Sequence, residues 1–267
     1  DGSELEVVCG GGMDNPVEIA FTDEGEPLVT VDILHNQPSR NDGIIFAIEG
    51  GNYPWHPVSS EFPRTGDLLP AIENLGWVAP SGIMRYRSTA FGPEYRNNLF
   101  TAQFNRHRIQ RHTLKRAGAA FECKTEDFLT SEDKNFHPTD VFEDADGSLI
   151  VIDTGGWFRI GCPTSKVPQP EIDDPRGLKI AWDRLTPNDL HPLLGDARFA
   201  VRDRAVHELS KRGQAALPTL ERIVTRERDS LIVREAVWAL TRIDRPEARR
   251  IVREVLLDND LSVKLSA

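Results

Sequence analysis

Short apolar runs separated by polar turns make up the first 166 residues. Runs rich in β-branched and aromatic residues, such as 27–31, 43–48 and 149–152, alternate with Gly, Pro, Asn and Asp. This alternation is typical of strands joined by tight turns. We therefore predict a mostly antiparallel all-β domain over residues 1–166.

Three segments of this half repeat one another. Each has a strand, a tight turn and a second strand, followed by a further strand candidate, and the copies begin at Asn15, Pro80 and His137. Four short strands at a period of about 60 residues are the pattern of β-propeller blades. The third copy lacks a clear fourth strand, and residues 3–9 resemble the closing strand of an earlier blade.

About three blades do not close a ring, because closed propellers need at least about four. An unclosed set leaves open sheet edges, which natural proteins avoid. We therefore expect the missing blades upstream, in another chain, or lost by truncation. Both ends of the chain look cut from a longer protein.

After residue 190 the apolar residues follow helical spacing. Leu, Ala, Val and Arg recur every three or four positions, and the run 204–209 matches 235–240 at an offset of 31 residues. Paired helices at about this period are typical of HEAT-type solenoids. We predict two full repeats and most of a third over 190–267, ending within the second helix of the third.

Between the two halves, three prolines in eight residues predict an extended linker over 167–189,. The fold class is therefore multidomain. An all-β propeller of about three blades, incomplete, is followed by an all-α HEAT-like solenoid.

The composition argues against some classes of function. The 267 residues are 39% hydrophobic and 28% charged, with a net charge of −10. So acidic a chain lacks the excess of Lys and Arg that neutralises phosphates, which argues against general binding of nucleic acid or anionic membrane. No apolar run approaches the roughly 18 residues of a transmembrane segment. Three widely spaced cysteines favour free thiols over one disulfide with an odd thiol.

The candidate binding residues follow from the repeat. Loops of several blades meet at the tunnel of a propeller, and the second strand of each copy ends at Asp32, Gln103 or Asp153. The loops behind these strands and the start of the last copy add further candidates, namely His35, Asn36, Asn105, Arg106, His107, His137 and Asp140. Such a rim can bind a polyol, a metal ion or an acidic group. The alternative is that Asp32 and Asp153 cap turns.

Other features favour structural roles. Residues 144–147 predict a hairpin turn rather than a calcium loop, because Gly147 stands where φ must be positive. No metal site and no familiar catalytic motif is predicted, and the catalytic residues are unknown. Trp238 is expected in the helical core, and the many arginines of the second half on a solvated, salt-bridged face.

Residues 137–141, 146–157 and 162–166 carry a resemblance to a known family. They are similar to the large planctomycete-type membrane-bound dehydrogenase proteins. Those join a propeller related to soluble glucose/sorbosone dehydrogenases to HEAT repeats and often to a C-terminal cytochrome c domain. The resemblance covers nearly the whole chain, matches its domain order and implies a secreted or periplasmic setting.

The resemblance implies pyrroloquinoline quinone and Ca²⁺ as cofactors, with haem c only outside this chain. In the quinoprotein sugar dehydrogenases, one Lys and two Arg contact the anionic quinone. The matching positions here hold Asn105, His137 and Thr139, so all three cationic contacts are replaced. The family's catalytic histidine would lie in upstream blades.

Two functions remain open. The first is a binding and scaffold module, whose rim holds a sugar or polyol and whose HEAT array docks a protein partner. The second is a quinone-dependent sugar or alcohol dehydrogenase that feeds a cytochrome c domain.

Overall fold

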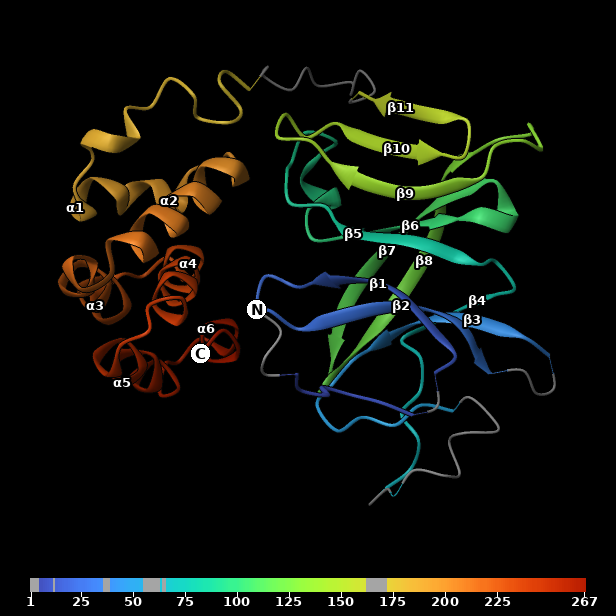
Figure 1. Ribbon diagram of the computed structural model, residues 1–267, viewed down its shortest axis with the longest axis horizontal. Helices are drawn as coiled ribbons and strands as arrows, with labels where there is room; N and C mark the ends of the chain where they lie inside the picture. The colour runs from blue at the N-terminus through green and yellow to red at the C-terminus, as the bar shows by residue number, and fades with distance from the viewer. Residues whose placement is uncertain (1–4, 12, 36–38, 55–62, 64–65, 162–171) are drawn as a thin grey trace.

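A computed structural model describes residues 5–11, 13–35, 39–54, 63, 66–161 and 172–267 of the protein. Strands form the first part of the chain and helices the last, as the patterning predicts. Figure 1 shows the sheets stacked on one side of the molecule and the helices on the other.

The strands form three antiparallel sheets. The first sheet has the order β1 (Asn15–Phe21), β2 (Pro27–His35), β3 (Asn41–Phe46), β4 (Glu73–Gly76). The second has the order β5 (Pro80–Arg85), β6 (Leu99–Gln103), β7 (Arg108–Ala117), β8 (Ala120–Thr130). In the described residues the third has three strands, β9 (Pro138–Glu143), β10 (Leu149–Asp153) and β11 (Gly156–Ile160). The three repeat starts fall on β1, β5 and β9.

Residues 5–9 do not form the strand that the patterning predicts. They have no strand pairing, and the side chains of Leu5 and Val7 are 94% and 77% exposed. One backbone bond, from Gly50 N to Val8 O at 2.8 Å, ties this segment to the first sheet. A strand needs a neighbour to satisfy its backbone groups, and no described strand lies beside this run.

The sheets stack with their first strands side by side, β1 on β5 and β5 on β9. Gly82 in β5 permits the close approach, because a Cβ there would lie 2.9 Å from the Cα of Asp140. Apolar side chains fill both layers. Between the first and second sheets the cluster includes Ala20, Leu28, Ile44, Ile83 and Leu99. Between the second and third it includes Phe100, Ala102, Ile109, Val141, Leu149 and Val151.

Two smaller predictions fall on described residues. Gly147 has a φ of 82° in the turn between β9 and β10, and its N–H donates to Asp144 O at 2.8 Å. The predicted hairpin turn is therefore confirmed. Cys9 and Cys123 are free, half-buried thiols, whereas Cys162 lies outside the described residues.

The described part of the second half has six α-helices: α1 (Pro187–Leu190), α2 (Phe199–Arg212), α3 (Leu217–Arg226), α4 (Ser230–Thr241), α5 (Pro246–Val255) and α6 (Leu261–Leu265). The two matching runs lie in α2 and α4, with α3 and α5 following each. Asp229 caps α4 and Asp260 caps α6, 31 residues further on, each accepting from backbone N–H groups. Because α6 repeats α4, it is the first helix of a third pair. The sequence pattern instead assigns this segment to the second helix of the third repeat.

The described part of the predicted linker, 172–189, is packed rather than extended. Trp182 is 3% exposed and belongs to the core of the helices, and its Nε1 donates to Gly177 O at 2.7 Å. Thr186 then starts α1 through a capping box with Asp189. An indole buried among helices outweighs the local preference of prolines for extended chain. The domain boundaries at 166 and 190 stay predictions.

Candidate functional site

The register of the strands tests which rim residues are equivalent. Gln103 and Asp153 hold the same position, since each lies opposite the proline that opens the neighbouring strand. In the first sheet this position is Val31, whereas Asp32 pairs with Asn15. Successive side chains point to opposite faces of a strand. Asp32 is therefore one residue out of step with the other two, which corrects the predicted equivalence.

Two predicted histidines meet at the edge of the second and third sheets. The rings of His107 and His137 lie 4.8 Å apart between centroids, and the His137 ring stacks on Phe104 at 4.5 Å. Each Nδ1 bonds a backbone carbonyl of the other segment, His107 to Phe136 O at 2.6 Å and His137 to Phe104 O at 3.1 Å. We call His107, His137 and Phe104 the histidine clasp.

The bonds of the clasp fix the tautomers. A carbonyl oxygen only accepts, so each neutral ring carries its proton on Nδ1. The Nε2 atoms then present lone pairs, and neither has a partner among the described residues. The clasp thus offers two hydrogen-bond acceptors, each of which becomes a donor when its ring is protonated.

Asp153 caps a turn, as the alternative interpretation predicts. Its Oδ1 accepts from His137 N at 2.5 Å and its Oδ2 from Gly155 N at 3.2 Å. The same residue lines a cavity of about 720 Å³, whose walls include the rings of Phe136 and Phe158. This cavity adjoins the clasp through Phe136, and it combines apolar rings with a carboxylate.

The other predicted residues of the second sheet divide between buried and exposed positions. Gln103 is fully buried, and its amide donates to Gln110 and accepts from Arg108. The amide is therefore engaged by protein groups rather than presented to a ligand. Asn105 and Arg106 are exposed. Arg106 Nε donates to Trp77 O at 3.2 Å, which places it between the first and second sheets.

Asp32 belongs to a charged group at the end of the first sheet. It pairs with Arg40, which also bonds Asp42 at 3.1 Å and lies over the ring of Trp77 at 5.5 Å. Burial and the nearby Asp42 raise the pKa of the Asp32 carboxyl. The side chain of His35 and all of Asn36 lie outside the described residues.

Asp42, which the sequence analysis does not single out, organises this group. Its side chain is fully buried and accepts from the backbone N–H groups of Ile33, Val78 and Ala79 at 2.8 to 2.9 Å. Burial alone would raise the pKa of its carboxyl, but these three donors outweigh burial and lower it. Asp42 thereby joins the first sheet to the chain entering β5.

Asp140 lies in the middle of β9, where it faces Gly82. From the other side Glu18 of β1 reaches the same glycine, and its Oε2 accepts from Ile83 N at 2.8 Å. Burial raises the pKa of both carboxyl groups, and Asp140 adds to the effect on Glu18. A signal for Glu18 exists in the sequence, because Glu18, Gly82 and Asp140 each stand two residues after the proline of their copy.

Among the described residues no three His, Cys, Asp or Glu side chains gather to hold a metal ion.

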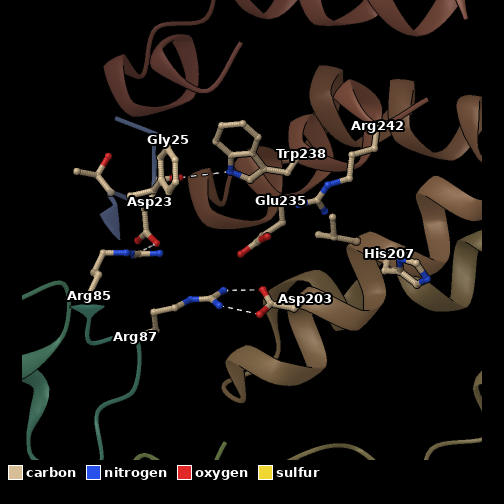
Figure 2. A pocket seen from close by; sticks show the side chains of 12 residues that line it. Asp23, Gly25, Arg85, Arg87, Asp203, His207, Glu235, Trp238 and Arg242 are labelled. Atoms are coloured by element: carbon tan, nitrogen blue, oxygen red, sulfur yellow. Dashed lines mark hydrogen bonds and ion pairs between the residues drawn. The ribbon is translucent and has the colours of Figure 1, made fainter. Parts of the chain in front are cut away.

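A second group of polar residues joins the sheets to the helices (Figure 2). Asp23, in the turn between β1 and β2, pairs with Arg85 at the end of β5 and lies 3.7 Å from Arg234 of α4. Trp238 Nε1 donates to Asp23 O at 3.3 Å. Burial alone would raise the pKa of Asp23, but the arginines, above all Arg85, lower it. We call this region the junction.

Arg87 and Asp203 form the second link of the junction. Two parallel hydrogen bonds of 2.7 and 2.6 Å join the guanidinium to the carboxylate, and Arg87 also lies over the ring of Phe199 at 5.0 Å. Arg202 nearby is 3% exposed, with Glu235 at 3.4 Å. The sequence predicts Arg202 on a solvated face, and its burial beside Glu235 corrects that prediction. Trp238 packs at the edge of the helical core, as predicted, and also contacts the sheets.

The comparisons with known proteins divide the chain in the same way. The family model described as "Domain of unknown function (DUF7133)" matches residues 10–160. The model described as "HEAT repeats" matches residues 187–267, which confirms the predicted HEAT-type repeats. No curated protein matches the chain. Within the part of the chain that the structure describes, every helix is too short or too polar to cross a membrane.

Three solved structures are similar to part of the chain. An oxidoreductase described as a glucose dehydrogenase, from Thermus thermophilus, is 20% identical over 55% of this chain and 40% of its own, with a TM-score of 0.41. A "glucose dehydrogenase" is 18% identical over 57% and 42%, with a TM-score of 0.41. Another glucose dehydrogenase is 20% identical over 61% and 49%, with a TM-score of 0.47. The chain thus spans less than half the length of each.

Proposed function

Because the chain belongs to the DUF7133 family, we propose that its three sheets are consecutive blades of a β-propeller whose rim binds a small polar ligand. In this proposal the HEAT repeats dock a protein partner, and the whole forms a binding module of a secreted or periplasmic protein. The observation that carries the rim site is the histidine clasp.

The blade arrangement is supported by how the sheets stack. In each sheet, the residue four positions after the proline of its copy pairs with a residue of the next strand. These cross-strand pairs are Ala20–Leu28, Met84–Phe100 and Phe142–Ile150, and they identify the same face of each sheet. The first pair packs against the second sheet, and the second pair packs against the third sheet. The third pair lines an open apolar surface, where Phe142 is 41% exposed. Its face repeats the docking faces of the other two sheets and accepts a further blade.

The ligand of the rim is proposed from the chemistry of its groups. Two imidazole Nε2 acceptors, an exposed Asn105 amide and the apolar rings beside Asp153 suit a molecule with several hydroxyl groups,. Hydroxyl groups donate to the lone pairs, and the ring of Phe158 packs on the apolar face of a sugar. We therefore propose a sugar or polyol.

Quinone-dependent oxidation fits less well. The positions matched to the cationic quinone contacts hold an exposed amide at Asn105, the clasp imidazole at His137 and a hydroxyl at Thr139 that donates to Ile152 O at 3.3 Å. None carries a fixed positive charge, and Arg40 nearby is paired with two carboxylates. The three matched positions do not fit a tri-anionic quinone, and no step through it is derived.

A glycan array probed with the full chain tests the proposal, followed by titration calorimetry on the hits. We expect saturable binding that His137→Gln weakens about tenfold, the effect of losing one good hydrogen bond. His191→Gln is the matched control, since His191 bonds Glu227 on the helical side. No hit above background rules out the sugar. Dye reduction with added quinone and Ca²⁺ would instead favour the dehydrogenase.

A further inference from the structure

A cavity of about 670 Å³ lies at the junction between the sheets and the helices (Figure 2). Its walls include Asp23 and Arg85 from the sheets and Glu235, Trp238 and Arg242 from α4 and its end. The apolar clusters of the described residues each draw on one side only. Polar and charged groups therefore dominate the contact between the two parts.

The arginines of the junction have more donors than the described residues accept. Four buried side-chain nitrogen or oxygen atoms in the described chain have no hydrogen-bond partner, and three of them are the Nε atoms of Arg85, Arg87 and Arg234. Arg242, which has no protein acceptor among the described residues, is exposed to solvent and is not one of these buried donors. Buried donors without acceptors are costly, and they point to a missing water or ion.

The missing group has a defined chemistry. Every unfilled group at the junction is an arginine N–H donor, so the group that fills the site supplies oxygen acceptors. The planar guanidinium fork matches the oxygens of carboxylate and phosphate. Three of the arginines with unused donors, Arg85, Arg87 and Arg242, line the cavity itself.

We propose that the junction cavity binds an oxyanion, a phosphate, sulfate or carboxylate group, through Arg85 and Arg242. The anion contacts the sheets through the first arginine and the helices through the second. It therefore stabilises the docking of the HEAT array on the sheets, since a ligand that binds only the docked form favours that form. This site is separate from the rim and does not depend on the rim's function.

Glu235 opposes the anion. Figure 2 shows its carboxylate inside the junction, between Arg85 and Asp203, where an ionised carboxylate repels a second anion. Its one ion pair among the described residues is Arg202 at 3.4 Å. Replacing Glu235 with Gln keeps the shape and removes the repulsion. Glu235→Gln is therefore expected to tighten anion binding, which a merely destabilised junction would not do.

The test uses the full chain and sodium phosphate, titrated at constant ionic strength with chloride as balance. We expect saturable heat in calorimetry and a matching rise in Tm. Arg242→Gln is expected to weaken binding about tenfold, as for one charge-assisted hydrogen bond. Because Arg242 is exposed, this variant should fold. Arg249→Gln is the control, an exposed arginine of α5 paired with Asp244 outside the cavity.

Parallel titrations with sulfate and citrate distinguish the source of the oxyanion. Tighter binding of citrate indicates a carboxylate ligand, and tighter binding of phosphate or sulfate indicates a tetrahedral anion. The proposal is overturned if phosphate, sulfate and citrate all act no differently from chloride, which would mean water alone fills the cavity. Equal loss in Arg242→Gln and Arg249→Gln would overturn it too.

Discussion

Gly25 lies against the indole ring of Trp238, so close that a Cβ on residue 25 would meet the ring carbon Cη2 at 2.5 Å. Gly25 also has a φ of 88°, in the left-handed region that favours glycine. Sheet and helix therefore touch at a point where only glycine fits. We expect Gly25→Ala to cost about 3 kcal/mol of unfolding free energy, combining backbone strain and overpacking. Urea unfolding monitored by fluorescence measures it.

Gly50→Ala separates the two causes. Gly50 has a φ of 70°, but nothing lies within 4 Å of its virtual Cβ. This variant carries the strain without the clash, and about 1 kcal/mol is expected. Equal costs at the two glycines would mean that the contact with Trp238 contributes nothing to docking.

Asp42 is expected to matter most at neutral pH. Its buried carboxylate accepts from three backbone N–H groups that join two sheets. Asp42→Asn places an amide against these donors and is expected to cost about 3 kcal/mol at pH 7. Because the folded-state pKa of Asp42 is lowered, its contribution is present above the usual aspartate pKa and is lost as pH falls through the lowered value. The gap between wild type and Asp42→Asn should shrink in acid.

Asp183→Asn serves as the reference for that measurement, because the Asp183 side chain is exposed on a short 3-10 turn. A surface change of this kind is expected within about 0.5 kcal/mol of wild type. A gap at Asp42 that stays constant from pH 7 to pH 3 would contradict the role assigned to its charge.

Glu143 is expected to stabilise the fold more at low pH than at neutral pH, the opposite of Asp42. Its carboxyl accepts from Arg87 N at 2.7 Å and Ser88 N at 2.8 Å, and burial raises its pKa to about 7. A raised pKa means that its contribution to stability is full below the usual glutamate pKa and is lost as pH rises towards 7. Relative to Glu143→Gln, wild type should lose about 3 kcal/mol across this window. Denaturation curves from pH 4 to 8 provide the test, and parallel curves would refute it.

Trp182 tests whether residues before α1 belong to the helical fold. Its indole is 3% exposed among helix side chains, and Arg204 lies over the ring at 4.6 Å. Trp182→Ala is expected to cost about 4 kcal/mol. Loss of helical circular dichroism at a lower temperature measures this cost. An unchanged Tm would show that the segment is a free linker, as the prolines alone suggest.

The repeats could be predicted because they depend on patterns of residues close together in the sequence. Alternating residues and tight turns mark β1, β5 and β9, and the 31-residue offset marks α2 and α4. The error at Asp32 has a local cause as well. β2 continues to His35, beyond Val31 at the equivalent position, whereas β6 and β10 end at Gln103 and Asp153. A count of apolar positions does not show where a strand ends relative to its partner.

The junction could not be predicted, because it depends on segments far apart in the chain. Asp23 and Trp238 are 215 positions apart, and the turn that holds Asp23 and Gly25 resembles any hairpin turn. Arg202 likewise has the spacing of a surface residue, but its side chain is buried and pairs with Glu235 of α4. The clasp lies between these cases. The repeat places His107 behind the second strand of one copy and His137 at the start of the next, but their contact depends on the stacking of two sheets.

The central claim is that the third sheet presents a docking face for a further blade. Maleimide labelling of Phe142→Cys tests it most directly, in the protein as its gene encodes it and with the native cysteines replaced by serine. Glu122→Cys is the control, because the Glu122 side chain is 70% exposed on β8. The account predicts that position 142 is protected while position 122 reacts at once. Equal labelling at both positions in the folded protein would contradict it.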